Sequence, residues 1–402
     1  MHHAKQQELF IAVSLLIAVG ILFSYSLSSY AVLLFDYKPY HFVLRHSIFG
    51  LTAILIMWTL SHVRSNPWLH WFGMTLFLGG LLVMALMPHM PAGWAVEVGG
   101  AKRWIDLKFF SIAPVEFFKV GFVYFLAWSL DRKYTIISEK QPLGREFNAI
   151  WPYLLVFSVS VFLIAVMQND LGQVVVLSLT LIVMLMFSGS SYKIFAILLS
   201  SGGAILILFI MIADHRIMRV KSWWMGAQHW FLSFLPESIA SKLRIGSGFE
   251  EGYQIAHSLN AVHHGGLFGV GMGNGIFKLG FLSEVHTDFV LSGIAEEFGF
   301  IGVLSVSLLM LFVLYRILVL ARSSIIEDKI HESGSLVGFL FGVGVTMLIA
   351  GAFLVNAFGI SSITPIKGIA VPFISYGGSS MIATAIAIGM VMMGTQSRAK
   401  KM

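Results

Sequence analysis

A carboxylate lies where the chain enters a long apolar run. Asp288 ends the short polar stretch His286-Thr287-Asp288, and the apolar residues after it predict a membrane helix. A charged group at the start of a membrane helix is costly to place there and usually indicates function. We therefore predict that Asp288 acts as a general base, a group that takes a proton from an attacking hydroxyl.

The same run contains a second acidic candidate, Glu296. Positions 288, 292 and 296 are four residues apart, so in a helix they share one face. The spacing predicts that Glu296 faces the same cavity as Asp288, with Ser292 between the two carboxylates. In a membrane such a carboxylate has to be neutral, paired with a cation, or hydrated.

The segment before Asp288 is rich in glycine, which permits tight turns and close approach of the backbone. No Gly-Lys-Ser or Gly-Lys-Thr follows, so the glycines do not form a nucleotide-binding P-loop. His257, His263 and His264 precede most of these glycines, but no cysteine joins them and nothing fixes their geometry. The pattern therefore disfavours a zinc site.

Several cations and acids outside this segment are further candidates, and some have two interpretations. Arg103, beside Trp104, indicates either a surface-lying amphipathic stretch or a clamp for pyrophosphate. Glu116 and Lys119 are three residues apart on one helix face, so they form either a structural ion pair or a substrate contact. Asp170 lies in a tight polar turn, where we expect it to cap the next helix.

Composition decides the environment of these residues. The chain has 402 residues, of which 57% are hydrophobic and only 11% charged; soluble domains carry about 25% charged residues. This predicts an all-α, polytopic membrane protein. The net charge of +6 suits an anionic membrane surface, and the cations are scattered through loops, so we predict no nucleic-acid partner. About ten runs are long enough to span a bilayer, at 9–29, 42–62, 67–87, 114–130, 150–168, 171–189, 193–213, 288–320, 335–358 and 376–396.

The distribution of Lys and Arg gives the orientation. With both termini in the cytoplasm the cations divide evenly between the two sides, but most outer ones lie in two long segments, 88–113 and 214–287. Long segments barely obey the positive-inside rule. We therefore assign both termini to the cytoplasm and 214–287 to a large extracytoplasmic loop before the eighth span. The glycines and prolines of 356–380 forbid a continuous helix, so this stretch is expected to line the outer cavity, with Lys367 inside it.

Several stretches together resemble the SEDS family of shape, elongation, division and sporulation proteins (the FtsW/RodA family), over about residues 9–396. The most specific are Lys278-Leu279-Gly280, His286-Thr287-Asp288-Phe289, Glu296-Glu297-Phe298-Gly299 and Pro372-Phe373-Ile374-Ser375-Tyr376-Gly377-Gly378-Ser379-Ser380. Supporting stretches are Arg45-His46, Arg103-Trp104, Pro114 with Glu116 and Lys119, Asp170-Leu171-Gly172, and Tyr253-Gln254 with Ser258. Lys367-Gly368 resembles the division type of the family, FtsW, more than the elongation type, RodA.

The chain also departs from the family pattern. The family's Gln-Pro-Ser-Glu reads Ala113-Pro114-Val115-Glu116, and its Pro-Asp-Leu-Gly-Thr reads Asn169-Asp170-Leu171-Gly172-Gln173. Phe358 and Ser362 stand where the family usually has glycine. None of these changes removes a charged group, so the chemistry is expected to survive.

The resemblance implies one integral membrane domain, residues 1–402, that polymerises lipid II into glycan strands outside the bacterial inner membrane and releases polyprenyl pyrophosphate. It implies Asp288 as the catalytic base, a divalent cation (Mg or Mn) that Asp288 could hold, and no organic cofactor. It also implies a class B penicillin-binding protein and other division-complex membrane proteins as partners. The implied substrate-binding residues are Arg45, Arg103, Glu116, Lys119, Asp170, Gln254, Ser258, Lys278, Glu296, Lys367 and Ser379.

Three alternatives fit the same composition. A lipid II flippase would use the same cavity and cations without making a bond. A scaffold of the division complex would tolerate loss of its outer acidic residues. An elongation-type polymerase would share the chemistry. The polar stretch 286–288 favours an enzyme, because a carrier has less need of one uncompensated carboxylate at the outer end of a helix.

Overall fold

The structure is a computed structural model of the 402-residue chain. It describes residues 2–63, 66–91, 93–98, 101–138, 142–212, 214–244, 252–282, 284–326, 335–365 and 368–396.

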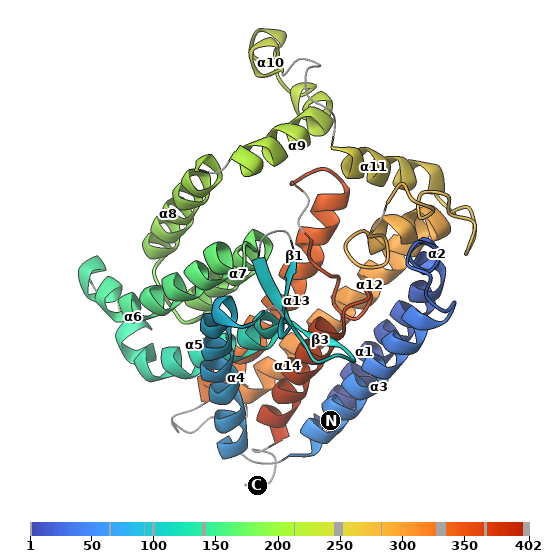
Figure 1. The fold of residues 1–402 in the computed structure, drawn as a ribbon. Coiled ribbons are helices and arrows are strands. Elements are labelled where there is room, and N and C mark those ends of the chain that lie inside the picture. Colours follow the sequence, from blue (N-terminus) through green and yellow to red (C-terminus); the bar gives the residue numbers. More distant parts are fainter. Residues whose placement is uncertain are drawn as a thin grey trace.

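Long helices make up most of the described chain (Figure 1). They confirm the prediction of an all-α polytopic membrane protein. Seven of the described helices are long and apolar enough to cross a membrane, and Leu171–Phe187 and Gly378–Gly394 are shorter apolar helices. The helices that match the predicted runs are α1 (His2–Leu27), α3 (His41–His62), α4 (Asn66–Leu86), α5 (Pro114–Ser138), α6 (Leu143–Phe162), α7 (Leu171–Phe187), α8 (Tyr192–Met211), α12 (Val290–Ile326), α13 (Ser335–Ile360) and α14 (Gly378–Gln396). Short elements join some of them: α2 (Ser29–Leu34), the 3-10 turn Met87–His89 and the π-turn Leu163–Met167.

Close packing of small residues holds the centre of the bundle together. A methyl group on Gly121 of α5 would lie 2.1 Å from the backbone nitrogen of Phe77 on α4. One on Gly344 of α13 would lie 2.4 Å from a methyl carbon of Val123 on α5. In lipid no hydrophobic effect drives helices together, so membrane helices usually associate through small residues that allow their backbones to approach closely. They bring α4, α5 and α13 into direct contact.

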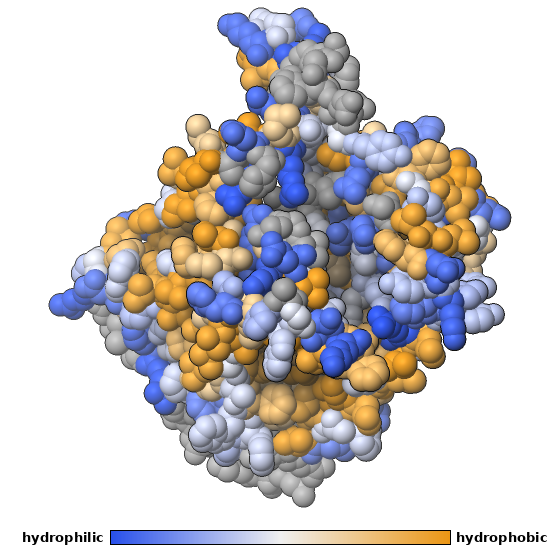
Figure 2. Space-filling model, in the orientation of Figure 1, coloured by the Kyte–Doolittle hydropathy of each residue, from blue (hydrophilic) through white to orange (hydrophobic). Residues whose placement is uncertain are grey.

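Helix α8 is the exception to this close packing. Ile205, Ile207 and Leu208 are each about 60% exposed, and only Ile194 of this helix is buried. Figure 1 shows α8 at the edge of the bundle, and Figure 2 shows apolar side chains over much of the helical body. Its exposed side chains are therefore suited to contact lipid.

A small antiparallel sheet, absent from the sequence prediction, follows α4. Its strands β1 (Ala95–Val98), β2 (Ala101–Asp106) and β3 (Ser111–Ile112) pair in sequence order. The sequence of this segment indicates either an amphipathic stretch on the membrane surface or a pyrophosphate clamp, and neither interpretation includes strands. The sheet contacts α5 and α14 and fixes the position of Arg103 on β2.

The segment 214–287 is helical in its first part. It contains α9 (Asp214–Leu232), α10 (Glu237–Leu243) and α11 (Tyr253–Gly265), and turns then lead to α12. Figure 1 shows α9, α10 and α11 at the end of the molecule opposite the start of α1 and the end of α14.

Helix α12 differs from the predicted run 288–320 at both a boundary and a break. It begins at Val290, and Gly299 has a positive φ of 67° inside it. At the break the backbone pairs with the glycine-rich loop instead: Val270 N donates to Glu296 O at 3.0 Å, and Phe300 N donates to Gly266 O at 2.9 Å. A short first part of α12 is therefore joined directly to the loop that precedes Asp288.

Candidate functional site

The loop that carries Asp288 is fastened by its backbone. Three consecutive carbonyls each accept a hydrogen bond from the C-terminal part of the chain. Tyr376 N donates to the oxygen of residue 286 at 2.9 Å, and Ser375 Oγ donates to the oxygen of residue 287 at 2.5 Å. Asn356 Nδ2 donates to the oxygen of residue 288 at 2.7 Å and to Ile369 O at 2.9 Å. These bonds place the Asp288 carboxylate without using it.

The carboxylate of Asp288 accepts no hydrogen bond from any residue that the structure describes. A methyl group on Gly368 would lie 2.6 Å from its Oδ2, so only glycine leaves room for it there. Burial, and then the negative charges of Glu284 and Asp170, raise the pKa of Asp288 to about 6. The side chain is thus held in place, short of solvation and ready to accept a proton near neutral pH.

Gly368 also lines a large cavity, with a volume of about 640 Å³. Helices α7, α8 and α13 supply its apolar wall, which includes Val175, Leu179, Leu206, Ile210, Leu354, Val355 and Phe358. Its polar lining comes from β2, from the turn before α7, from the start of α9 and from the segment after α13: Arg103, Asn169, Asp170, Arg216, Arg219 and Thr364. The cavity therefore joins an apolar compartment to a cationic one, with Asp288 next to it.

The turn before α7 is built by Asp170 and Arg103. Asp170 Oδ1 accepts from Gln173 N at 3.2 Å, which confirms the predicted cap. Arg103 donates from Nε to Gln168 O at 2.7 Å and from Nη2 to Asn169 O at 2.9 Å. Burial raises the pKa of the Asp170 carboxyl, while the Gln173 hydrogen bond and the charge of Arg103 act against that rise. Both predicted residues line the cavity, but Arg103 already donates hydrogen bonds to two carbonyls of the turn.

Glu116 and Lys119 form the structural ion pair that was one of their two interpretations. Lys119 Nζ lies 3.0 Å from Glu116 Oε2 and donates to Gln173 Oε1 at 2.6 Å. Gln173 Nε2 donates in turn to Glu116 Oε1 at 2.8 Å. The closed ring joins α5 to α7, and none of the three residues lines the large cavity.

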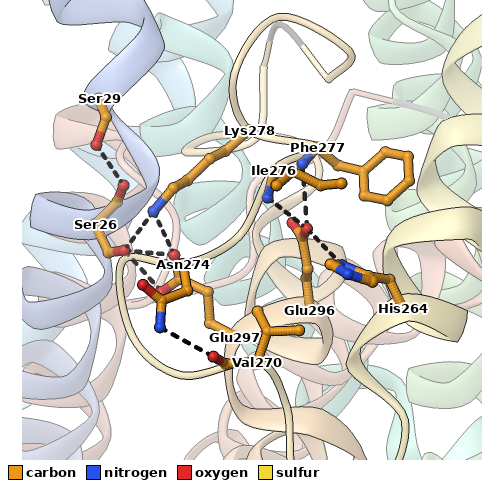
Figure 3. Close-up of polar contacts among 10 residues, drawn as sticks. All are labelled: Ser26, Ser29, His264, Val270, Asn274, Ile276, Phe277, Lys278, Glu296 and Glu297. Atoms are coloured by element: carbon orange, nitrogen blue, oxygen red, sulfur yellow. Dashed lines mark hydrogen bonds and ion pairs between the residues drawn. The ribbon is translucent and has the colours of Figure 1, made fainter.

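Two adjacent acids at the end of the first part of α12 anchor the glycine-rich loop (Figure 3). Glu297 pairs with Lys278 at 2.6 Å, and both bond to Ser26 of α1. Glu296 accepts from Ile276 N at 2.7 Å and lies 3.1 Å from His264 Nδ1.

The prediction that Glu296 faces the cavity of Asp288 is therefore wrong. Helix α12 starts only at Val290, so a four-residue helical spacing does not extend back to position 288. Ser292, expected between the two carboxylates, bonds instead to Ser258 at 2.7 Å. Lys278, predicted to bind substrate, is buried in its ion pair and is likewise absent from the cavity lining.

Four more predicted residues, all within the described chain, are absent from the cavity lining. Ser258 is buried and donates to Ile360 O at 3.1 Å, so its contacts are structural. Ser379 accepts from Ala113 N at 3.0 Å and ties α14 to the sheet, since it also donates to Ser111 O at 3.3 Å. Arg45 donates to Phe109 O at 3.1 Å, and Gln254 is exposed on α11. Lys367 lies outside the described residues.

Sequence reasoning missed three residues that the structure brings to the site. Asn356, which holds the Asp288 carbonyl, is an amide near the end of an apolar helix, and that position was a usable signal. Arg216 and Arg219 line the cavity. Their sequence gave them no such role, because α9 has the composition of a surface-lying helix.

The described residues contain no group of three His, Cys, Asp or Glu side chains that could hold a metal ion. The divalent cation implied by the resemblance stays a prediction.

The comparisons with known proteins cover nearly the whole chain. The model of a family described as "Cell cycle protein" (FtsW, RodA and SpoVE) matches residues 6–400. A probable peptidoglycan glycosyltransferase FtsW of Helicobacter pylori (strain ATCC 700392 / 26695) is 45% identical over 388 residues, 96% of this chain and 97% of that protein. A protein of the same name from Aliivibrio salmonicida (strain LFI1238) is 34% identical over 88% of this chain and 80% of its own.

Solved structures show the same fold. A chain from a study of structural coordination of polymerization and crosslinking by a peptidoglycan synthase complex has a TM-score of 0.70, with 22% identity over 98% of both chains. The rod shape determining protein RodA of Thermus thermophilus has a TM-score of 0.62, with 23% identity over 98% of this chain and 97% of that one.

The buried Lys278–Glu297 pair predicts a stability effect. Lys278→Met should lower the free energy of unfolding by about 3 kcal/mol or more, because Glu297 is left buried without its cation. Thermal unfolding in detergent measures it. The double variant Lys278→Met/Glu297→Leu should recover much of the loss, since no charge stays buried. The exposed pair Arg244–Glu237, at 3.4 Å, is the control: Arg244→Gln should cost under about 1 kcal/mol. Equal losses in both single variants would contradict the anchoring role.

Proposed function

Because the chain belongs to the FtsW/RodA/SpoVE family of cell cycle proteins, we propose that it is a peptidoglycan glycosyltransferase that polymerises lipid II during cell division. Relatives 45% and 34% identical to it carry that enzyme name and the division-type designation FtsW. The proposed substrate has a polyprenyl tail, a diphosphate and a disaccharide-peptide, and each part needs a different environment.

One observation carries the proposal. A carboxylate without a hydrogen-bond donor among the described residues, with its pKa raised to about 6, adjoins a cavity that is apolar on one side and cationic on the other. A general base is most effective when its pKa lies near the working pH. Gly368 forms the junction, because it lines the cavity and touches the Asp288 carboxylate.

The chemistry follows from this arrangement. Asp288 takes the proton of the acceptor sugar's 4-hydroxyl as that oxygen attacks the anomeric carbon of the donor. The new glycosidic C–O bond forms while the C–O bond to the diphosphate breaks, and the electron pair of that bond leaves with the polyprenyl diphosphate. Attack opposite the leaving group inverts the anomeric centre. The proton on Asp288 then passes to water. The diphosphate is a stable anion, so the leaving group needs cations and no acid.

The walls of the cavity suit the tail of such a lipid. Leu206 and Ile210 come from α8, which is the least buried of the seven candidate spans in the described chain, and Leu354 and Phe358 come from α13. A polyprenyl chain could therefore extend along apolar residues from the bilayer into the site without crossing water.

The placement in the cell is part of the same proposal. We place the protein in the bacterial inner membrane with the cavity on the outer side. The support is the positive-inside pattern of the short loops and the position of α9 and α11 at the end of the bundle opposite the start of α1 (Figure 1).

Asp288 should control the rate through its ionisation. Polymerisation by the purified protein should rise with pH through about 6, because only the ionised carboxylate accepts a proton. At pH values well above 6, where the wild-type carboxylate is ionised, Asp288→Asn should lower the rate about 10²–10⁴-fold. It should also abolish the rise with pH and leave thermal stability near that of the wild type. The measurement is the length and amount of glycan made from lipid II.

Glu284→Gln is the matched control, since it also removes one acidic charge. It should keep the activity and move the pH midpoint downward, because one charge that raises the pKa of Asp288 is gone. A near wild-type rate for Asp288→Asn would show that another group is the base. Lipid II translocation without any polymer, in wild type and variant alike, would favour a flippase.

A divalent cation stays a prediction from the resemblance. Assays with a chelator and with added Mg²⁺ or Mn²⁺ test it. A rate that falls with the chelator and returns with either ion would support it, and a rate that never changes would contradict it.

We further propose a class B penicillin-binding protein as a partner, with other division-complex membrane proteins around the pair. The support is that a chain of the same fold belongs to a peptidoglycan synthase complex that joins polymerization to crosslinking. Co-purification from membranes, and polymerase rates with and without the candidate, test the pairing. No co-purification together with an unchanged rate would argue against it.

A further inference from the structure

Two arginines of α9 give the cavity a feature that the family resemblance did not assign. Arg216 and Arg219 line it together with the apolar residues of α8. We propose that Arg219, supported by Arg216, binds the diphosphate of the polyprenyl substrate. This rests on the proposed function for the identity of the lipid. It takes the place of the interpretations of Arg103 as a pyrophosphate clamp and of Lys119 as a substrate contact.

Arg103 and Lys119, the two cations with a possible substrate contact in the sequence, are already occupied. The Nε and Nη2 groups of Arg103 donate hydrogen bonds to the carbonyls of Gln168 and Asn169. Lys119 is held between Glu116 and Gln173 and does not line the cavity. Moving either cation to a phosphate would break the turn before α7 or the link between α5 and α7.

The arginines of α9 are placed differently. Arg216 lies over the ring of Phe209 at 4.0 Å and donates to Phe209 O at 3.0 Å and Asn169 Oδ1 at 3.3 Å. Its buried Nε has no partner among the described residues. Arg219 lines the cavity and makes no hydrogen bond or ion pair with any residue that the structure describes. Arg219 is therefore the cation that can bind an anion without breaking a protein contact.

The face of α9 that carries these residues is fixed against the site. Residues 216, 219 and 223 are three and four apart, so they share one face of the helix. On that face Trp223 Nε1 donates to Ser362 O at 2.8 Å, in the segment that continues to Gly368. That bond joins α9 to the segment after α13, whose Thr364 and Gly368 also line the cavity.

The charge and shape of the lining indicate the class of ligand. Arg103, Arg216 and Arg219 face a single carboxylate, Asp170, so the cavity has excess positive charge. Arginine presents a planar fork that matches phosphate oxygens. A free phosphate or a sugar nucleotide fits the cavity less well, because neither has an apolar part that would contact the apolar wall. A prenyl chain that ends in a diphosphate satisfies both parts.

Binding of short prenyl compounds tests the proposal without requiring turnover. The full chain in lipid nanodiscs is titrated with farnesyl diphosphate, farnesyl monophosphate and farnesol. The wild type should bind the diphosphate most tightly. Arg219→Gln should weaken diphosphate binding about tenfold or more, the size expected for a charge-assisted hydrogen bond, and leave farnesol binding unchanged. Arg219→Lys should weaken it less, since the charge stays and the fork is lost.

Lys242→Gln is the control, because it removes an exposed cation of α10 that does not line the cavity. It should change no affinity. Unchanged diphosphate binding in Arg219→Gln, or an equal loss for farnesol, would overturn the proposal. Asp288→Asn should bind the diphosphate normally while polymerisation is lost, so the binding proposal and the enzyme proposal can fail separately. If Arg219→Gln loses binding but the wild-type protein never polymerises, the binding site is supported and the enzyme is refuted.

Discussion

Three hydrogen bonds to consecutive backbone carbonyls, at residues 286, 287 and 288, hold the site together. Their donors, Tyr376 N, Ser375 Oγ and Asn356 Nδ2, come from α13 and from the segment after it. A loop at the start of a membrane helix has backbone groups that must find partners. Here the partners are protein groups, so the backbone of Asp288 is held in place while its carboxylate stays available for chemistry.

The acids of the first part of α12 show how the chain separates structure from chemistry. Glu296 and Glu297 are buried and accept several hydrogen bonds, which makes them anchors for the glycine-rich loop. Asp288 has the opposite environment, because among the described residues it has acidic neighbours and no donor, and its pKa rises to about 6. Neighbouring carboxylates thus differ in role because their surroundings differ.

The cations divide in the same way. Arg103 and Lys119 donate hydrogen bonds to the turn before α7 and to α7 itself. Arg219 has no partner in the described chain and lines the cavity. A reaction that expels a diphosphate needs positive charge fixed before the charge develops. The largely exposed α8 lines the same cavity as the arginines of α9. These two adjacent helices can therefore bind the apolar and the charged part of one substrate.

The sequence by itself determined the membrane environment, the positions of nearly all long helices and the candidate base. Apolar runs of spanning length, and the cost of a charge beside them, are local properties that a sequence displays. It could not show that α12 starts at Val290 and breaks at Gly299, because the loop carbonyls and amides that compete with helix hydrogen bonds come from residues 266–271. For the same reason Glu296 was wrongly placed in the cavity. Which cations are occupied and which are available was decided only by the tertiary structure, since the Arg103 partner Gln168 and the Lys119 partner Gln173 each lie more than fifty positions away along the chain.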